Sequence, residues 1–135
     1  MSDKIFFDTN VILYSYSLIT DYKSMRAKGL INETNSVIST QVLQEVCNIL
    51  IKKFKLEQNI ILKTLTELNR NFKILINNSE TINKAVDIHF RYHYSYYDSL
   101  IIASALKHEC SVLYSEDLQH NQVIEKGLTK INPFT

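Results

Sequence analysis

The sequence has few of the residues that break or cross-link a chain. Its 135 residues include two glycines, one proline, two cysteines and no tryptophan. So little glycine and proline leaves no flexible linker, repeat or low-complexity tract, and we expect one domain over residues 1–135. Cys47 and Cys110 lie in apolar surroundings without metal-type spacing. We therefore expect buried thiols in a reducing compartment, and we place the protein in the cytoplasm.

Long apolar runs and a one-sided charge are absent as well. No run approaches the ~20 residues that span a bilayer, and the N-terminus lacks the pattern of a signal peptide, so we expect no membrane association. Fifteen Lys and Arg against fourteen Asp and Glu give a net charge of +1. This near balance gives no global signature of nucleic-acid binding, although it does not exclude a local basic patch.

Residues 4–10, KIFFDTN, are the stretch around which the chain is organised. A continuous apolar run bounded by polar residues predicts a strand buried on both faces of a parallel sheet. Asp8 would follow the carboxyl end of this strand, where open α/β sheets bind their ligands. Asn10 is expected to cap a helix that starts at Val11. Taken alone, Asp8 is explained equally well as a helix cap.

Helices and strands alternate along the rest of the chain. Further strands are predicted at residues 36–39, 72–76, 111–115 and 130–134, the last at an edge of the sheet. Helices are predicted at 21–28 (capped by Asp21 and closed by Gly29), 41–54 (capped by Thr40), 56–69 (with Ile60, Ile61, Leu65 and Leu68 inward), from Ser79 as cap, and from Tyr96 through Leu106, with a final short helix ending at Gly127. This order predicts an α/β fold: a parallel β-sheet with helices on both faces, in three α/β/α layers.

Four acids fall at one edge of the predicted sheet. Asp8 and Asp117 follow two strands, Glu45 lies just inside the helix after a third, and Asp98 lies in the first turn of the helix before the fourth. Each has a structural explanation alone, such as the helix dipole for Asp98. Together, four carboxylates repel one another unless a cation lies among them. Hard oxygen ligands select Mg²⁺ or Mn²⁺, and such a site can activate water for phosphodiester hydrolysis.

A second candidate metal site is weaker. His89 and His93 are four residues apart on a predicted helix and could share a metal ion. No third ligand accompanies them, so we expect surface or interface histidines.

The acidic motifs resemble those of the PIN-domain nucleases. They are DTN at 8–10, VLQEV at 42–46, YDSLIIASA at 97–105 and SED at 115–117. The size and whole-chain coverage resemble the VapC-type toxins of prokaryotic toxin–antitoxin pairs. The resemblance implies a Mg²⁺- or Mn²⁺-dependent endoribonuclease, a homodimer, and a small antitoxin that blocks the site. By position, it implies that the metal-binding acids are Asp8, Glu45, Asp98 and Asp117, that Asn10 and Ser115 are supporting polar residues, and that Glu116 is an auxiliary candidate.

Two other function classes compete with a nuclease: an aspartate-phosphorylated domain or phosphatase, and a silent binding module. An aspartate-based phosphatase of the haloacid type would need an acid at position 10, where this chain has Asn10. A response-regulator receiver would need its phosphate-accepting Asp after the middle strand, where Asn77 and Asn78 stand. A catalytically silent PIN-like binding module would be expected to lose one or more of the four acids. All four are present, which favours an enzyme.

The substrate expected on these grounds is single-stranded or looped RNA. A loop presents splayed bases that need few contacts, whereas a duplex hides its base edges from side chains. The expected contacts are scattered cations and stacking tyrosines, namely Lys52, Lys53, Lys55, Arg91, Tyr94, Tyr96 and Tyr97. An aromatic stretch is a candidate dimer face or antitoxin groove, unless it packs inside the subunit: Tyr14, Tyr16, Leu18, Ile19 and Tyr22.

Overall fold

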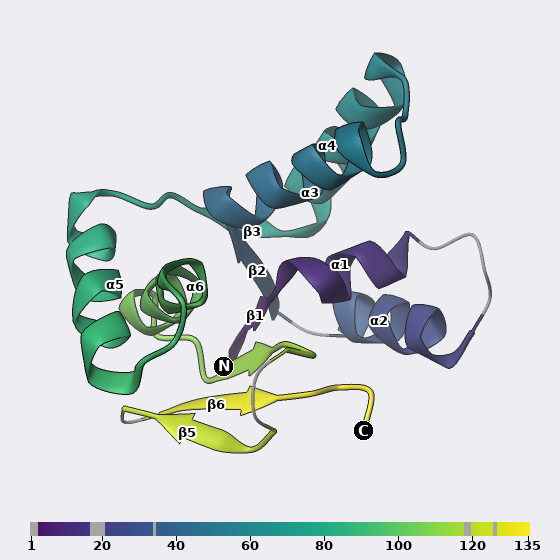
Figure 1. The fold of residues 1–135 in the computed structure, drawn as a ribbon. Helices are drawn as coiled ribbons and strands as arrows, with labels where there is room; N and C mark the ends of the chain where they lie inside the picture. Colours follow the sequence, from purple (N-terminus) through teal and green to yellow (C-terminus); the bar gives the residue numbers. More distant parts are fainter. Residues whose placement is uncertain (1–2, 17–20, 34, 118–119, 126) are drawn as a thin grey trace.

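A six-stranded sheet of order β3-β2-β1-β4-β6-β5 forms the centre of the computed structural model (Figure 1). The structure describes residues 3–16, 21–33, 35–117, 120–125 and 127–135. The strands are β1 Lys4–Phe7, β2 Asn35–Ser39, β3 Lys73–Leu75, β4 Val112–Tyr114, β5 Gln122–Ile124 and β6 Leu128–Ile131. All neighbours pair in parallel except β5, which is antiparallel to β6.

Helices cover both faces of this sheet, as the alternating pattern predicted. They are α1 Thr9–Ser15, α2 Tyr22–Glu33, α3 Thr40–Lys52, α4 Gln58–Asn71, α5 Ser79–Tyr92 and α6 Tyr96–Lys107. α1 and α2 lie on one side and α5 and α6 on the other, while α3 and α4 project together from the body (Figure 1). We call the outer part of this projection, residues 49–71, the arm. No helix in the described ranges is long and apolar enough to cross a membrane.

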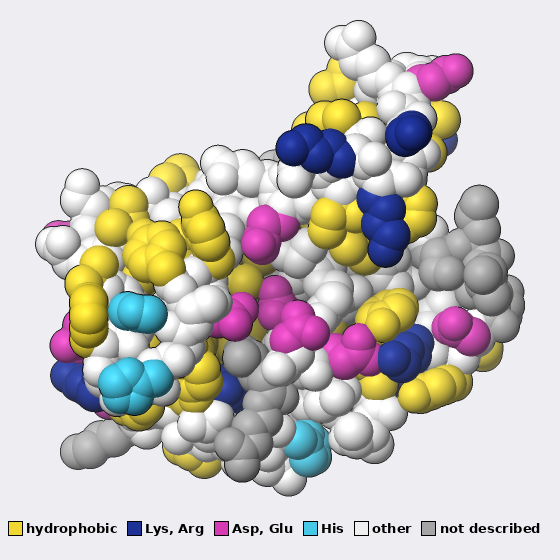
Figure 2. Space-filling view, in the orientation of Figure 1, with side chains coloured by type: hydrophobic (Ala, Val, Ile, Leu, Met, Phe, Trp, Pro, Cys, Tyr) yellow, Lys and Arg dark blue, Asp and Glu magenta, His cyan; other side chains and the backbone are white. Residues whose placement is uncertain are grey.

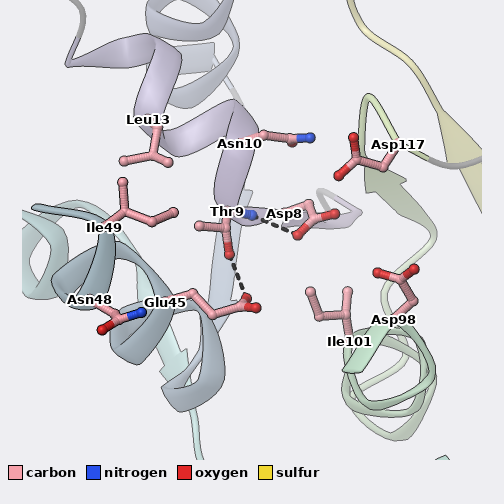
Figure 3. A pocket seen from close by; sticks show the side chains of 10 residues that line it. All are labelled: Asp8, Thr9, Asn10, Leu13, Glu45, Asn48, Ile49, Asp98, Ile101 and Asp117. Atoms are coloured by element: carbon pink, nitrogen blue, oxygen red, sulfur yellow. Dashed lines mark hydrogen bonds between the residues drawn. The ribbon is translucent and has the colours of Figure 1, made fainter. Parts of the chain in front are cut away.

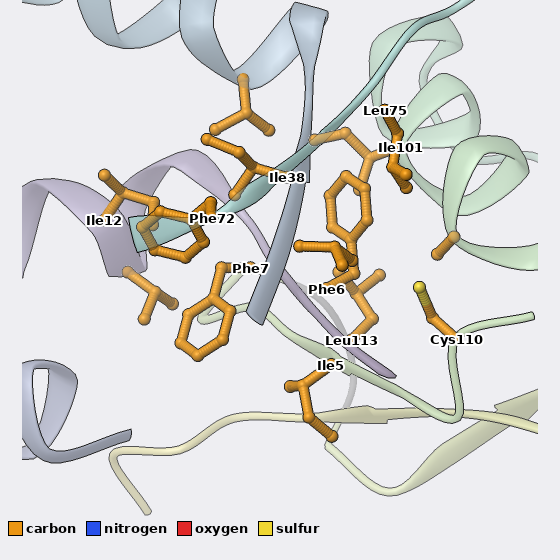
Figure 4. Close-up of a cluster of buried hydrophobic side chains, with 14 of the residues drawn as sticks. Ile5, Phe6, Phe7, Ile12, Ile38, Phe72, Leu75, Ile101, Cys110 and Leu113 are labelled. Carbon is orange, nitrogen blue, oxygen red and sulfur yellow. The ribbon is translucent and has the colours of Figure 1, made fainter. Parts of the chain in front are cut away.

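The apolar run of β1 lies at the middle of the hydrophobic core. Phe6 and Phe7 are fully buried, and successive side chains of a strand point to opposite faces. Figure 4 accordingly shows Phe6 beside Leu113 and Ile101, and Phe7 on the other side. The Phe7 ring meets the Phe72 ring edge to face, with centroids 5.6 Å apart. Burial on both faces fixes the register of β1, and this holds Asp8 at its carboxyl end.

Several predicted helix ends were wrong by one or more residues. Asp8, Ser39 and Asn78 are the N-caps of α1, α3 and α5, in place of the predicted Asn10, Thr40 and Ser79. In each case the residue before the first helical one carries a side-chain oxygen and takes the role. The predicted cap Asp21 is confirmed, since its Oδ1 accepts a hydrogen bond from the Ser24 amide at 2.8 Å. Gly29 does not end that helix, because α2 continues to Glu33.

The predicted C-terminal helix is also wrong. Residues 122–124 form the strand β5, which pairs with β6 in a hairpin. Gly127 has a φ of +110°, so it belongs to the hairpin turn, where glycine is favoured, and does not end a helix. β6 therefore lies between β4 and β5 and is not the edge strand. Ile60, predicted to face inward, lies in the first turn of α4 and is 44% exposed.

Candidate active site

A pocket of about 310 Å³ opens at the carboxyl edge of the sheet. The four predicted acids come to it from four separate segments: the β1–α1 junction, α3, α6 and the residues after β4. Figure 3 shows their side chains around a common space, with Leu13, Ile49 and Ile101 as apolar wall. The full lining is Asp8, Thr9, Asn10, Leu13, Glu45, Asn48, Ile49, Asp98, Ile101 and Asp117.

Asp8 is the most buried of these acids, at 6% exposed. Its Oδ1 accepts a hydrogen bond from the Thr9 amide at 2.7 Å, and its Oδ2 accepts one from Ser115 Oγ at 2.8 Å. Its pKa is raised to about 6: desolvation by burial is the largest cause, the charges of Glu45 and Asp117 add to the rise, and the two hydrogen bonds oppose it. The protein thus holds a carboxyl group in a place where its negative charge is unfavourable.

Glu45 reaches the pocket from α3, opposite Asp98. Its Oε1 accepts a hydrogen bond from the Thr9 hydroxyl at 2.7 Å, drawn dashed in Figure 3. No Lys or Arg forms an ion pair with Glu45 among the described residues, in line with the unfavourable spacing to Lys52 and Lys53. Thr9 therefore bonds to two of the acids, through its amide to Asp8 and through its hydroxyl to Glu45.

Asp98 and Asp117 complete the acidic set on the other side of the pocket. Asp98 lies in the first turn of α6, where its amide bonds to the cap residue Ser95. Desolvation raises the pKa of Asp117, and the charges of Asp98 and Glu116 add to this effect. The acids therefore act on one another electrostatically across the pocket.

Asn10 lines the pocket with an orphaned polar atom. Its Oδ1 is buried and has no hydrogen-bond partner. A buried acceptor without a donor is unfavourable by about 1–3 kcal/mol, and a bound cation or its water would satisfy it. Figure 3 shows the Asn10 side chain extending toward Asp117.

Ser115 and Glu116, the other two predicted site residues, differ in their placement. Ser115 is 1% exposed and links two acids, since its Oγ donates to Asp8 and accepts from the Asp117 amide at 3.3 Å. Glu116 does not line the pocket. It pairs with Lys23 of α2 and accepts a hydrogen bond from Tyr14 at 2.8 Å, so it joins α1, α2 and the end of β4.

The donor set fits a hard divalent cation. Carboxylate and amide oxygens are the ligands that Mg²⁺ and Mn²⁺ prefer, and a cation would reverse the electrostatic effect that raises the pKa of Asp8. In the described part of the chain, no three His, Cys, Asp or Glu side chains stand close enough to hold a metal ion as placed. Mutually repelling carboxylates are expected to stand apart, so binding would need small side-chain movements. His89 instead shares a hydrogen bond with the carbonyl oxygen of Tyr94.

Two residues near the site escaped the sequence prediction. Thr9 stands inside the DTN motif, but only the structure shows that its hydroxyl bonds to Glu45. Lys130 is 1% exposed; burial lowers its pKa to about 8, while the charge of Asp98 opposes the shift. Its Nζ donates to the Tyr94 hydroxyl at 3.1 Å and lies 4.3 Å from that ring centroid. Lys130 lies two residues after the buried Leu128 on β6. Residues two apart on a strand share a face, and this was the only feature of the sequence that could have predicted the burial of Lys130.

Comparison with known proteins gives one family match. The family model described as PIN domain matches residues 5–126. This range includes all four acids of the pocket. No curated protein sequence matches the chain.

Solved structures with a similar fold come from several bacteria. A toxin–antitoxin complex from Klebsiella pneumoniae is 21% identical, with 96% of this chain and 98% of that chain covered and a TM-score of 0.74. Mycobacterium tuberculosis VapC20, described as a sarcin–ricin loop cleaving toxin, is 19% identical, with 84% and 89% covered and a TM-score of 0.69. VapBC2 from Rickettsia felis, bound to a promoter DNA fragment, is 16% identical, with 94% and 96% covered and a TM-score of 0.69. At these identities the likeness shows the fold.

Proposed function

Because the chain belongs to the PIN domain family, we propose that it is a divalent-cation-dependent endoribonuclease. The observation that carries this proposal is the convergence of Asp8, Glu45, Asp98 and Asp117, from four separate segments, on one pocket. The raised pKa of Asp8 and the orphaned Oδ1 of Asn10 support a cation in that pocket. Neither feature is needed by a fold that only packs its core.

The four carboxylates are the proposed ligands, with Asn10 beside them. Mg²⁺ or Mn²⁺ bound there would lower the pKa of a water and stabilise negative charge on a phosphate. The chain's own residues hold the ligands in place: Ser115 and the Thr9 amide orient Asp8, and the Thr9 hydroxyl orients Glu45. Such supporting hydrogen bonds tune metal affinity in many sites.

The nucleophile is expected to be water. Among the described residues, the pocket lining contains no Cys, His, Lys or Ser. The hydroxyl of Thr9 donates to Glu45, a proposed cation ligand, so we assign Thr9 to positioning that ligand and the attack to water. We propose that water attacks the phosphorus and the bond to the 3′-oxygen breaks, so that the products carry a 5′-phosphate and a 3′-hydroxyl. The proposed substrate is single-stranded or looped RNA, whose bases are accessible.

Biologically, we propose a toxin held in check by a cognate antitoxin in the cytoplasm. One similar structure is described as a toxin–antitoxin complex and another as a toxin, which supports an antitoxin partner for this chain. A homodimer is also proposed. The predicted aromatic face serves it poorly, since Tyr14 and Tyr16 are partly buried and packed against the core. Tyr22 is 64% exposed, and Leu18 and Ile19 lie outside the described residues.

Helix α5 offers a better face for association. Ile82, Val86 and Phe90 lie four residues apart on it and are 42%, 44% and 72% exposed. Residues at this spacing form one stripe along a helix. Sedimentation of the wild type and of a Phe90→Ser variant tests it: the proposal expects a dimer that the substitution weakens, and a wild-type monomer at micromolar concentration would contradict it.

RNA cleavage tests the nuclease directly. With Mn²⁺, the purified protein should cut a hairpin RNA in its loop, EDTA should stop the reaction, and the products should carry 5′-phosphates. Activity that persists in EDTA, or products ending in 2′,3′-cyclic phosphate, would overturn the mechanism, because the cyclic product uses the RNA's own 2′-hydroxyl. RNA binding without cleavage in Mn²⁺ would instead identify a silent binding module.

A further inference from the structure

The turn between α3 and α4 carries an exposed basic and aromatic segment, Lys52-Lys53-Phe54-Lys55. We call it the KKFK turn. All four side chains are exposed, and Phe54 is 54% exposed. Lys53 Nζ lies 5.8 Å from the Phe54 ring centroid. None of the three lysines forms an ion pair with a described residue. Lysines without ion pairs next to an exposed aromatic ring are typical of surfaces that bind single-stranded nucleic acid.

The backbone of the turn gives an independent observation. The amide of Leu56 bonds to the Leu50 carbonyl at 3.1 Å, which closes the end of α3. Lys55, just before it, has a φ of +51°. Glycine is the usual residue at this left-handed position after a helix, because a Cβ is unfavourable there. A strained non-glycine residue points to a role for its side chain.

Helix geometry connects the turn to the pocket. Asn48 and Ile49 line the pocket, and Lys52 and Lys53 follow each of them by four residues. Residues four apart lie on one face, about 6 Å further along the axis. Figure 2 shows Lys and Arg side chains along the arm on the same face of the molecule as the acidic cluster. An RNA strand that enters the pocket would therefore contact the turn through the neighbouring nucleotides.

The charge distribution favours the arm as the place where RNA is held. The arm holds five Lys or Arg and two Glu, in a chain of net charge +1, so the remainder is net negative. Three cations outside the arm are engaged in ion pairs: Lys23 with Glu116, Arg91 with Asp87 and Glu125, and Lys107 with Glu80. An acidic pocket repels a polyanion, so binding needs cations free to meet phosphates.

We propose that the KKFK turn is the strand-gripping element of this protein, with the lysines on phosphates and Phe54 stacked on a base. This inference rests on the proposed RNA substrate and assigns its binding surface. Neighbouring Ile51 and Leu62 are also exposed, which suits a protein partner. The turn itself has three cations and one ring, a composition that favours a nucleic-acid strand. An acidic peptide is therefore the competing occupant in the test.

The test measures binding of a labelled single-stranded RNA of about 12 nucleotides. EDTA is present throughout, so no cleavage occurs and the result does not depend on nuclease activity. The variants are Lys52→Gln/Lys53→Gln, Phe54→Ala and Lys55→Gly. Lys28→Gln is the matched control, since Lys28 is an exposed lysine of α2 without an ion pair to a described residue.

The double variant should bind about tenfold more weakly at low salt, and its slope of log affinity against log salt should fall by about 1.4. Phe54→Ala should lose about tenfold as well. Lys55→Gly should bind RNA more weakly yet melt at an equal or higher temperature, because glycine relieves the left-handed strain. Lys28→Gln should bind RNA like the wild type.

Wild-type RNA affinity in the double variant and in Phe54→Ala would overturn the inference, as would an equal loss in Lys28→Gln. Variants that keep RNA affinity but lose an acidic test peptide would assign the turn to a protein partner instead. Failure of cleavage in Mn²⁺, with the binding losses as expected, would leave the turn as assigned and overturn only the proposed nuclease.

Discussion

The pocket and the KKFK turn follow one another along the same helix, α3, and their physical chemistry is opposite. Glu45, near the start of α3, faces a partly buried group of acids that hydrogen bonds hold in position. Lys52, at the end of α3, is exposed and without an ion pair to a described residue. Although the chain is nearly neutral, its acidic and basic side chains are therefore concentrated in different regions. The net charge of +1 concealed an acidic region and a basic one.

The pocket and the arm also differ in how strongly burial and hydrogen bonds fix their side chains. Asp8 and Ser115 are almost fully buried next to the sheet, whereas the arm projects from the body (Figure 1). Chemistry requires fixed groups, and burial with supporting hydrogen bonds provides them. Contacts to a flexible strand tolerate long, mobile side chains. We expect substitutions in the pocket to alter catalysis and pH dependence, and those in the arm to alter binding and salt dependence.

The largest effect is expected from Asp98→Asn. Loss of one proposed metal ligand should lower the cleavage rate at least about 100-fold, because several kcal/mol of charge stabilisation depend on the cation. RNA binding in EDTA should stay at or above the wild-type affinity, since a negative charge is removed. Multiple-turnover cleavage and fluorescence anisotropy measure the two effects. A variant that keeps its cleavage rate would remove Asp98 from the site.

Asp8→Asn should reveal the unfavourable charge in the pocket. The folded-state pKa of Asp8 is about 6, above its ordinary value of 3.8. The folded protein is therefore most favoured when the Asp8 carboxyl is protonated, below pH ~4. The free energy of unfolding then falls as the pH rises to ~6, because the buried carboxyl becomes charged. The variant should be more stable than the wild type by about 3 kcal/mol above pH 6, and nearly equal below pH 4. Urea unfolding in EDTA at several pH values measures the difference, and a pH-independent difference would contradict it.

Thr9→Val tests the support given to Glu45. Valine keeps the shape of this side chain, which is 8% exposed, but removes the hydroxyl that bonds to Glu45. Supporting partners of this kind typically change metal affinity 10- to 100-fold, and we expect a loss of about that size in Mn²⁺ affinity. Calorimetric titration gives the affinity. Unchanged Mn²⁺ binding would show that Thr9 does not position a ligand.

The smallest effect is expected from Glu116→Gln, the control next to Asp117. Its ion pair with Lys23 has side chains 24–30% exposed, so its loss should lower stability by about 1 kcal/mol or less. Since Glu116 does not line the pocket, cleavage should stay within about threefold of the wild type. A loss as large as that of Asp98→Asn would place Glu116 among the catalytic acids.

The fold was predictable wherever burial fixes both faces of an element. The run Ile5-Phe6-Phe7 identified β1, and the alternation of elements identified a parallel sheet with helices on both faces. The hairpin of β5 and β6 was missed because the segment 122–127 is short and half of it is polar, and its glycine suits a helix end as well as a turn. Tertiary pairing with β6 decided between them.

The placement of the four acids was predictable, but their hydrogen bonds were not. The four acids follow from their places at one edge of the sheet, and the structure brings all of them to one pocket. The roles of Thr9 and Lys130 depend on contacts between residues 36 positions apart in each case, which no local pattern encodes. Glu116 and Asp117 are adjacent in sequence, yet only Asp117 lines the pocket.

The central claim is that four carboxylates form one divalent-cation site. Anomalous diffraction from crystals soaked in Mn²⁺ tests it without relying on activity. The account predicts an anomalous peak in the pocket, with Asp8, Asp98 and Asp117 drawn toward it and Glu45 reaching it directly or through water. A crystal of the Asp8→Asn variant should show a weaker peak or none. A pocket without a peak at saturating Mn²⁺ would contradict the account.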